Sequence, residues 1–530
     1  MNKARRYLMV ICVFVLLTGG AAAFILAFER KPEISNWQQA DRSAVIRPDY
    51  TGTVIAPNIA PLNFLVQEQG TYYHVKIHSK QGAPIEIFSR KGKIVIPENS
   101  WHRLLNANRG QPLYFDVFVQ GRDGGWLRFE TVENTIAAEN IDPYIFYRKL
   151  HPTHRLFSGD IGIYQRDLRN YDERLVLGKK YLQQGSCLNC HTFCNNRTDK
   201  MLIGVRSGVY GNSTLLIEGG QVSKIAAKFG YSSWHPSGRL VVYSIDELPM
   251  FYHTARNEVR DTVHIDSLLA YHVLGSGKVS TCAKFSQKDR LETWPAWSPD
   301  GRYLYFCSAP KLWPGQEDEL PPSLYNQAKY DIVRIRYDLD SDQWGELETV
   351  VSAQDTQLSA GVPAISPDGR WLLFCMFDYG YFPAWQQSSD LYIVDLQAAG
   401  ETGQYKWRRL NINSDQSEAW HTWSSNSRWI VFSSKRDYGV FTRPYISYID
   451  HAGRVYKPIV LPQKDPALYD HCLQTYNTPE FAIEPVHHSG EKLARMARRP
   501  GGISVDMPVT MATPITKTQP GYVPGAGERE

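Results

Sequence analysis

One turn sequence recurs four times along the chain, and it limits the fold more than any other feature. The copies are SSWHPSGRLVVYS at 232–244, PAWSPDGRYLYFCS at 295–308, PAISPDGRWLLFCM at 363–376 and HTWSSNSRWIVFSS at 421–434. Each copy has an apolar stretch before the turn and an apolar strand after it. In the turn, proline presets φ, aspartate hydrogen-bonds locally and glycine accepts a positive φ. The pattern predicts repeated β-hairpins.

The copies begin 63, 68 and 58 residues apart, which predicts a β-propeller with a loop insertion in each blade. The SPDGR signature resembles the TolB-like, WD-like propeller family over residues 213–486, and this resemblance implies a fold but no function. STLLIEGGQVSKIA and YNTPEFAIEPV flank the clear copies as further candidate blades. We therefore predict about six blades, with five and seven left open. Unrelated sandwich domains are the alternative.

The first 30 residues have the pattern of a membrane anchor. Lys3, Arg5 and Arg6 precede an uncharged run of 22 residues from Tyr7 to Phe28. As a helix this run would be about 33 Å long, enough to cross a bilayer. We predict an uncleaved transmembrane helix, with a cleaved signal peptide as the alternative. Because basic flanks stay in the cytoplasm, we expect a single-pass protein of the bacterial inner membrane with its bulk in the periplasm.

The other segments differ in composition, and the whole chain is predicted to be mainly β. Residues 31–49 are expected to form a linker. Residues 50–140 carry short β-branched and aromatic runs separated by turn residues, which predicts a β-sandwich-like domain. The segment 141–212 contains YDERLVLGKKYLQQG, a helix-like stretch. The last residues, 487–530, are rich in glycine and proline and are predicted to be a disordered tail.

A possible cofactor motif, GSCLNCHTF, lies at 185–193. Cys187 and Cys190 are separated by two residues, and His191 follows directly. Zinc would need four ligands, and adjacent Cys190 and His191 cannot easily reach one tetrahedral ion. A thioredoxin-like dithiol would need a βαβ surround. Haem c fits better than either, because the two thiols add to the haem vinyl groups and the histidine is then placed under the iron.

The motif resembles that of c-type cytochromes, in which a helix bearing a glycine and an aromatic residue precedes it. Gly178 and Tyr181 hold those places here. The resemblance implies one covalent haem c, bound by Cys187 and Cys190 with His191 as the axial iron ligand. About 40 residues separate His191 from the first clear repeat, fewer than a small cytochrome uses. We therefore expect 141–212 to be a short helical haem c segment that leans on the propeller or the sandwich.

The sixth iron ligand is left open by the sequence. His253 is ranked first, because it lies in a blade insertion that would rise over the haem. Met201 is local to the motif, and Met250 follows a proline as cytochrome methionine ligands often do. An open sixth position is the alternative. A bis-histidine pair would lower the reduction potential, and a histidine–methionine pair would raise it.

Three further residues lie close enough in sequence to the motif to matter. Arg197 and Arg206 are candidates for pairing with haem propionates, because a guanidinium offers two parallel donors to a carboxylate. Cys194 is interpreted as a spectator thiol. The chain has eight cysteines, too few for a disulfide-built fold of 530 residues.

The net charge of +4, from 58 basic and 54 acidic residues, makes nucleic acid an unlikely partner class. We predict a mono-haem electron-transfer protein that uses the propeller to dock a periplasmic redox or assembly protein. One alternative is a haem-based redox or gas sensor, or an assembly protein. Another is an enzyme resembling the cytochrome cd-type reductases. No catalytic residue and no small-molecule substrate is evident, so whether the chain is an enzyme stays undecided.

Overall fold

The computed structural model describes residues 34, 36–152, 161–182, 186–207, 209–313, 319–504, 517–518 and 522–524. The predicted transmembrane anchor at 1–30 lies outside these residues. Within the described part of the chain, no helix has both the length and the apolar character needed to span a membrane. The fold is mainly β, as predicted, and contains many four-stranded antiparallel sheets that are consistent with propeller blades.

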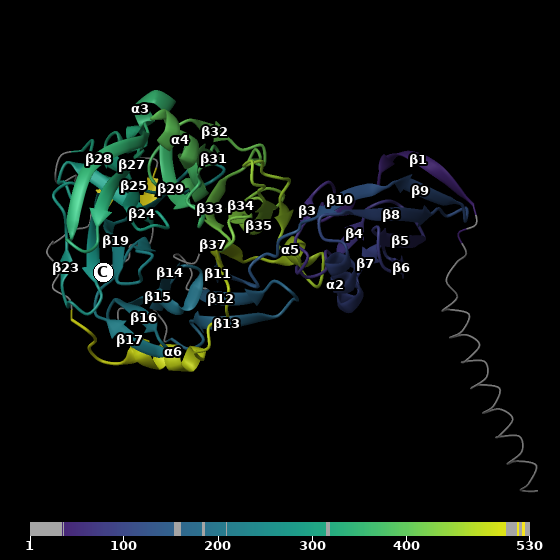
Figure 1. Cartoon of the computed structure of the whole chain (residues 1–530), viewed down its shortest axis with the longest axis horizontal. Coiled ribbons are helices and arrows are strands. Elements are labelled where there is room, and N and C mark those ends of the chain that lie inside the picture. The colour runs from purple at the N-terminus through teal and green to yellow at the C-terminus, as the bar shows by residue number, and fades with distance from the viewer. Residues whose placement is uncertain are drawn as a thin grey trace, which may run out of the picture.

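The described residues from 36 to 136 hold two sheets and one helix (Figure 1, purple and blue). The seven-stranded sheet contains β1 (Trp37–Ser43), β3 (Val54–Ile55), β5 (Tyr72–His78), β6 (Ile85–Ser89), β8 (Pro112–Gln120), β9 (Trp126–Glu130) and β10 (Val132–Ile136). The three-stranded sheet contains β2 (Ile46–Arg47), β4 (Phe64–Val66) and β7 (Lys93–Ile94). Helix α2 (Glu98–Ala107) turns Trp101, Leu104 and Leu105 toward the core, because residues three and four apart share one helix face.

Six four-stranded antiparallel sheets make up most of the remaining described residues, and we number them sheets 1 to 6. Sheet 1 comprises β11 (Tyr144–Leu150), β12 (Ile161–Asp167), β13 (Glu173–Gly178) and β37 (Thr475–Ala482). Sheet 2 comprises β14 (Ser186–Cys194), β15 (Arg197–Ser207), β16 (Ser213–Glu218) and β17 (Gln221–Ile225). Sheet 3 comprises β18 (Ser232–Trp234), β19 (Leu240–Glu247), β22 (Asp266–Val273) and β23 (Val279–Ser280). Sheet 4 comprises β24 (Arg290–Trp297), β25 (Tyr303–Pro310), β27 (Asp331–Asp338) and β28 (Gln343–Val351). Sheet 5 comprises β29 (Ser359–Ile365), β30 (Trp371–Phe377), β31 (Asp390–Asp395) and β32 (Trp407–Arg409). Sheet 6 comprises β33 (Glu418–Trp423), β34 (Trp429–Ser434), β35 (Arg443–Tyr448) and β36 (Ile459–Val460).

Shorter elements lie in the connections and the C-terminal segment. They are β20 (Met250–His253), β21 (Arg260–Thr262), β26 (Glu319–Leu320), α3 (Ala353–Thr356), α4 (Leu396–Thr402), α5 (Leu468–His471), α6 (Gly490–Arg498), β38 (Lys517–Thr518), β39 (Tyr522–Pro524) and two 3-10 turns, Tyr325–Gln327 and Pro383–Trp385.

The innermost strands of the six sheets form a closed ring. Strand β37 contacts β14, β14 contacts β18, and the contacts continue through β24, β29 and β33 back to β37. Sheet 1 joins β37, from the C-terminal part of the chain, to β11, from the N-terminal part. Figure 1 shows β37 beside β11 where the two parts meet. Hydrogen bonds between these strands close the ring, an arrangement consistent with a six-bladed propeller.

The recurrent turn is organised by its serine. In sheet 4, Ser298 Oγ donates to Asp300 Oδ1 at 2.6 Å and accepts from Tyr303 N at 2.9 Å. Gly301 completes the turn with φ of 72°, a conformation that glycine adopts without steric cost. The same contacts recur around Ser366 in sheet 5 and Ser424 in sheet 6. The four predicted hairpins are therefore confirmed, and three of them share this serine clasp, while His235 takes the place of the serine in sheet 3.

The helix predicted before the cysteine motif is wrong. Strand β13 occupies Glu173–Gly178 and pairs with β12, and Tyr181 lies in the turn that follows. Residues of this stretch such as Glu, Arg, Leu and Lys favour helix locally. Burial of Val176 and Leu177 in the core shared by sheets 1 and 2 outweighs that preference. The described part of 141–212 is therefore β-structure, and the expectation that this segment is helical is wrong.

A second correction concerns the predicted tail. Helix α6 forms inside 487–530 and packs Leu493, Ala494 and Ala497 against β13, β16 and β17. Ser489 caps the helix, since its side chain accepts a hydrogen bond from the backbone N–H of Lys492. These residues belong to the folded core and are not part of a disordered tail.

Candidate functional site

The cysteine motif lies at a bulge in β14, the innermost strand of sheet 2. Leu188 pairs with Val205 and His191 pairs with Ile203, so three steps along β14 face two steps along β15. The extra residue falls within Asn189–Cys190, whose side chains lie outside the description. Bulges re-aim side chains and are frequent next to functional sites. This one places the motif at the inner wall of the ring.

The same bulge recurs in four other innermost strands. Their extra residues are Trp294–Pro295 in β24, Val362–Pro363 in β29, Trp420–His421 in β33 and Thr478–Pro479 in β37. The first residue of each pair has a φ of 45° to 55°, in the left-handed region. Three of the four pairs end in proline, whereas the pair in β14 ends in cysteine. The motif therefore lies at a β-bulge that recurs in the other sheets with different residues.

His191 is buried without a hydrogen bond. Its side chain is 0% exposed, and neither Nδ1 nor Nε2 has a hydrogen-bond partner among the described residues. The ring centroids of Phe146 and Phe193 lie 6.1 Å and 5.5 Å from the centroid of the imidazole ring. Burial, assisted by the charge of Arg148, lowers the pKa of His191 to about 3. The imidazole is therefore neutral at pH 7 and keeps a lone pair available.

Glu480 is the nearest acidic group to this histidine. Its Oε2 lies 3.7 Å from His191 Nε2, beyond hydrogen-bond distance, while its Oε1 accepts from the backbone N–H of Phe193 at 3.2 Å. Burial raises the pKa of Glu480 to about 8. Both groups are therefore uncharged at pH 7, and the pair is not a salt bridge at that pH.

His191 and Glu480 line a cavity at the centre of the ring, which we call the histidine cavity. Its empty space is about 770 Å³, part of it open to solvent. Other lining residues are Thr214, Phe229, Tyr231, Trp294, Trp420 and His421. Every innermost strand contributes to this wall or abuts it, so the cavity is a feature of the ring and not of one sheet.

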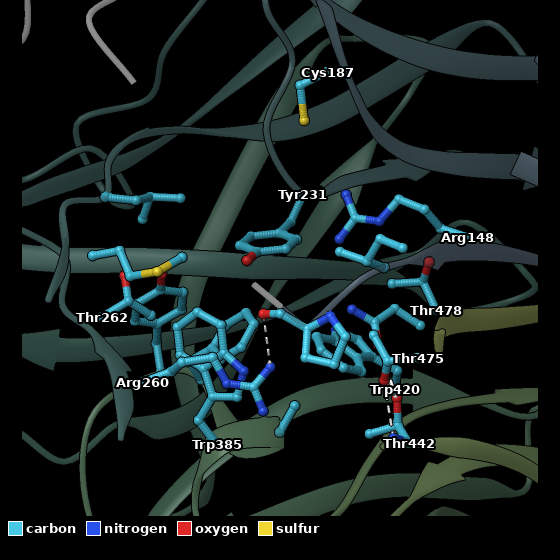
Figure 2. A pocket seen from close by; sticks show the side chains of 18 of the residues that line it. Arg148, Cys187, Tyr231, Arg260, Thr262, Trp385, Trp420, Thr442, Thr475 and Thr478 are labelled. Atoms are coloured by element: carbon cyan, nitrogen blue, oxygen red, sulfur yellow. Dashed lines mark hydrogen bonds between the residues drawn. The ribbon is translucent and has the colours of Figure 1, made fainter. Parts of the chain in front are cut away.

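A second cavity, which we call the cysteine cavity, adjoins the first. Cys187 lines it, and its empty space is about 1090 Å³, again partly open to solvent. Figure 2 shows Cys187 at one side of this cavity, Tyr231 across its middle, and Arg260 and Trp385 at the other side. Tyr231 and Trp420 line both cavities. Cys187 lines only the cysteine cavity and His191 only the histidine cavity, so these two aromatic residues belong to the wall that the cavities share.

Aromatic rings pack closely at the wall that the two cavities share. Tyr231 stacks on Trp294 with ring centroids 3.6 Å apart, and Phe382 meets Trp420 edge to face at 5.3 Å. Stacked and edge-to-face rings are geometries that aromatic quadrupoles favour. A flat apolar ligand would find matching surfaces here.

The structure separates the three candidates for a sixth ligand. Met250 lines the cysteine cavity together with Cys187. Met201 is 0% exposed in the core between sheets 1 and 2 and lines neither cavity. His253 lies in β20, where its Nε2 is 2.8 Å from Asp261 Oδ2, and it also lines neither cavity. The order ranked from the sequence is therefore not the order of proximity to the cavities.

The other residues near the motif have distinct surroundings. Arg206 lines the cysteine cavity, whereas Arg197 pairs with Asp199 at the surface. Cys194 is buried, and its Sγ donates to the carbonyl of His235 at 3.9 Å. Burial raises the pKa of the Cys194 thiol to about 11, which keeps it protonated and unreactive.

We tested whether these residues fit a haem c. A buried imidazole normally has a partner, so two unbonded nitrogens at His191 fit a group supplied from outside the chain. Cys187 faces space, and cationic residues line the same cavity. Among the described residues, no cluster of three or more His, Cys, Asp or Glu side chains could hold a bare metal ion. The strand geometry differs from the helix expected from cytochromes, but the donor set fits.

Two residues of this site were missed by the sequence analysis. Glu480 lies in YNTPEFAIEPV, a stretch noted only as a candidate strand, and Arg148 lies before the motif in β11. Arg148 Nη1 donates to the carbonyl of Leu188 at 2.9 Å, which fastens sheet 1 to the cysteine motif. Aligning Pro479–Glu480 with the repeated bulge would have placed Glu480 at the ring centre. No local signal marks Arg148.

Comparisons with known proteins return similarities of fold only. No protein-family model and no curated protein matches the chain. Puromycin hydrolase is similar with a TM-score of 0.34 and 13% identity, covering 60% of this chain and 45% of its own. A prolyl endopeptidase has a TM-score of 0.34 and 12% identity, covering 61% and 42%. Dipeptidyl peptidase 4 from Porphyromonas gingivalis has a TM-score of 0.28 and 11% identity, covering 56% and 43%. The chain thus spans less than half the length of each of these three proteins.

Proposed function

We propose that this chain is a mono-haem c protein that transfers electrons, with its haem attached at the centre of the ring of sheets. The observation that carries the proposal is His191, directly after a Cys-x-x-Cys pair. Its imidazole is wholly buried, and neither nitrogen has a hydrogen-bond partner among the described residues. A buried polar group without a partner costs about 1–3 kcal/mol. Ligation of an iron by His191 would remove part of that cost.

The proposal gives each residue of the motif a role. Cys187 and Cys190 would hold the haem through thioether bonds, and His191 would be a ligand of its iron. Phe146 and Phe193 pack around the imidazole and fix its orientation. When bound, the haem supplies a one-electron redox centre. The apolar side chains around it would lower the local dielectric and so tune its potential.

The location and the partner belong to the same proposal. Covalent haem attachment at Cys-x-x-Cys-His takes place outside the cytoplasm, which agrees with an anchor that leaves the bulk of the chain in the periplasm. The partner would be a periplasmic redox or assembly protein docked on the ring. Fractionation of cells expressing the full chain tests this, because a membrane-bound, periplasm-exposed product is expected.

The test is expression of the full chain in a host with haem c maturation enzymes. Haem is expected to stay with the polypeptide after denaturation. Cys190→Ala should abolish or sharply reduce this bound haem, because one thioether is lost. Cys194→Ala is the matched control, since Cys194 lies in the same strand and is expected to retain haem fully. Equal haem content in both variants would overturn the assignment of Cys190.

One observation favours a second candidate function, a redox or gas sensor. Of the three predicted sixth ligands, Met250 lines the cysteine cavity, and neither His253 nor Met201 lines either cavity. An iron on His191 would then have Met250 or an open position. Carbon monoxide added to the reduced protein distinguishes these cases. An unchanged low-spin spectrum supports electron transfer, and a shifted spectrum supports sensing.

A further inference from the structure

Two buried cations share one carboxylate at the wall of the cysteine cavity. Glu258 accepts from Arg260 through two nitrogens, at 2.6 Å and 2.7 Å, and from Lys435 Nζ at 2.5 Å. The side chains of Arg260, Lys435 and Glu258 are only 11%, 8% and 17% exposed. We call these three residues the cationic triad, because their summed charge is positive.

The two cations differ in the number of side-chain hydrogen bonds that they make to described residues. Arg260 also donates through Nη1 to the carbonyl of Pro152 at 3.3 Å, and its guanidinium carbon lies 5.4 Å from the centroid of the Trp385 ring. Lys435 Nζ has three N–H donors, and Glu258 is its hydrogen-bond acceptor among the described residues. Both cations line the cysteine cavity. Lys435 therefore has donor capacity left at the cavity wall.

Among the described residues, no other acid forms a hydrogen bond or ion pair with Lys435 or Arg260. Asp246 also lines the cysteine cavity, but its oxygens accept from Ser244 at 2.7 Å and Ser267 at 2.9 Å, and it faces His264 at 3.5 Å. Burial lowers the pKa of Lys435, so the surroundings oppose its ammonium charge. Since a buried charge requires a counter-charge, one further anion would balance the triad.

The triad lies across the cavity from the motif. In Figure 2, Arg260 and Cys187 are on opposite sides of Tyr231. The carboxylates of a haem likewise lie on the edge of the macrocycle away from its thioether bonds. A flat ligand held at Cys187 would therefore direct its acid groups toward the triad, past Tyr231 and Trp385, which line the same cavity.

We propose that Lys435 and Arg260 bind a carboxylate group within the cysteine cavity. Resting on the proposed function, this carboxylate is a propionate of the attached haem. A free organic acid has the same chemistry and is the other source. Charge-assisted hydrogen bonds from two cations are the strong class of such contacts.

The test uses the full chain with Cys187→Ala and Cys190→Ala, which cannot attach haem, and follows quenching of its tryptophan fluorescence. The two probes are protoporphyrin IX, with two carboxylates, and its dimethyl ester, with none. The acid is expected to bind at least about tenfold more tightly, the ratio that 1.4 kcal/mol represents. Lys435→Met should reduce that preference to less than about twofold, a residual of under 0.5 kcal/mol.

Two controls keep the result interpretable. Lys435→Arg retains the charge and should retain the preference for the acid. Lys457→Met removes an exposed lysine, 40% exposed and paired with Asp49, and should change neither affinity. If Lys435→Met weakens acid and ester equally, or if acid and ester bind alike from the start, the inference is overturned.

The source of the carboxylate is decided with the haem-loaded chain. Benzoate that binds it by calorimetry, and fails to bind Lys435→Met, assigns the site to a free organic acid. Absence of benzoate binding assigns the site to the propionate. Failure of the proposed function is a separate result, because a chain without covalent haem would still show the preference for protoporphyrin IX over its ester.

Discussion

Two histidines line the same central cavity, and they differ in their hydrogen bonding. His191 and His421 are both buried beside an innermost-strand bulge, and burial lowers their pKa values to about 3 and about 4. His421 Nε2 lies 3.1 Å from the carbonyl of Leu373, and its Nδ1 is 3.6 Å from Cys375 Sγ. Among the described residues, His191 has no such partners.

Burial alone does not explain the difference in hydrogen bonding between these two histidines. Both imidazoles are neutral at pH 7, so neither needs a counter-charge. The ring of sheets satisfies His421 from its own backbone, which makes that residue part of the structure. It offers His191 only aromatic rings and a carboxyl at 3.7 Å. The strand that carries the two cysteines is therefore the one whose histidine needs an outside partner.

The largest expected effect concerns the spectrum of the haem-loaded chain. His191→Ala should remove the axial ligand, so the visible spectrum changes throughout, although the thioether bonds keep the haem attached. His421→Ala should leave the band positions unchanged, because that imidazole is already bonded to the protein. Absorption spectra of both variants, oxidised and reduced, make the measurement. Matching shifts in the two variants would mean that the histidines do not differ in role.

The next effect is on stability without haem, in the Cys187→Ala, Cys190→Ala background. His421→Leu should lower the free energy of unfolding by about 1–3 kcal/mol, because the carbonyl of Leu373 loses its donor. His191→Leu should be neutral or stabilising, since an unbonded polar group is replaced by an apolar one. Urea unfolding at pH 8 measures both. A larger loss for His191→Leu than for His421→Leu would contradict the contrast.

The smallest effect is the pH dependence of the difference in unfolding free energy between the parent and His421→Leu. His421 has a pKa of about 4 when folded and about 6.5 when unfolded, so its unfolded form binds protons first as the pH falls. The parent therefore loses stability through this group below pH 6.5, whereas His421→Leu does not. By pH 6 the gap between them should narrow by about 1 kcal/mol. Unfolding curves at pH 8, 7 and 6 check the direction, and a gap that widens would contradict it.

The repeated hairpins were predictable because their turns are local. Ser298, Asp300 and Gly301 fix the turn within a few residues, so the same letters specify the same clasp wherever they occur. Both flanking stretches that were noted as candidate blades became strands, β16 with β17 in sheet 2 and β37 in sheet 1. Local chemistry therefore fixed most of the ring.

The rest depended on contacts that leave no local trace. Sheet 1 exists because β37 pairs with β11, more than 300 residues earlier, with Leu150 opposite Thr475. The same long-range closure converts a helix-like stretch into β13 and brings Glu480 and Arg148 to the cysteine motif. The motif itself was visible in the sequence. Its place inside the ring was not, because the bulge in β14 shows only in the register with β15.

The most direct test of a haem at this site is peptide mass spectrometry of the mature full chain. Trypsin cleavage after Lys180 and Arg197 releases one peptide that contains Cys187, Cys190 and Cys194. The account predicts that this peptide carries the mass of one haem, with only Cys194 open to alkylation after denaturation. Alkylation of all three cysteines, at the mass of the bare peptide, would contradict it.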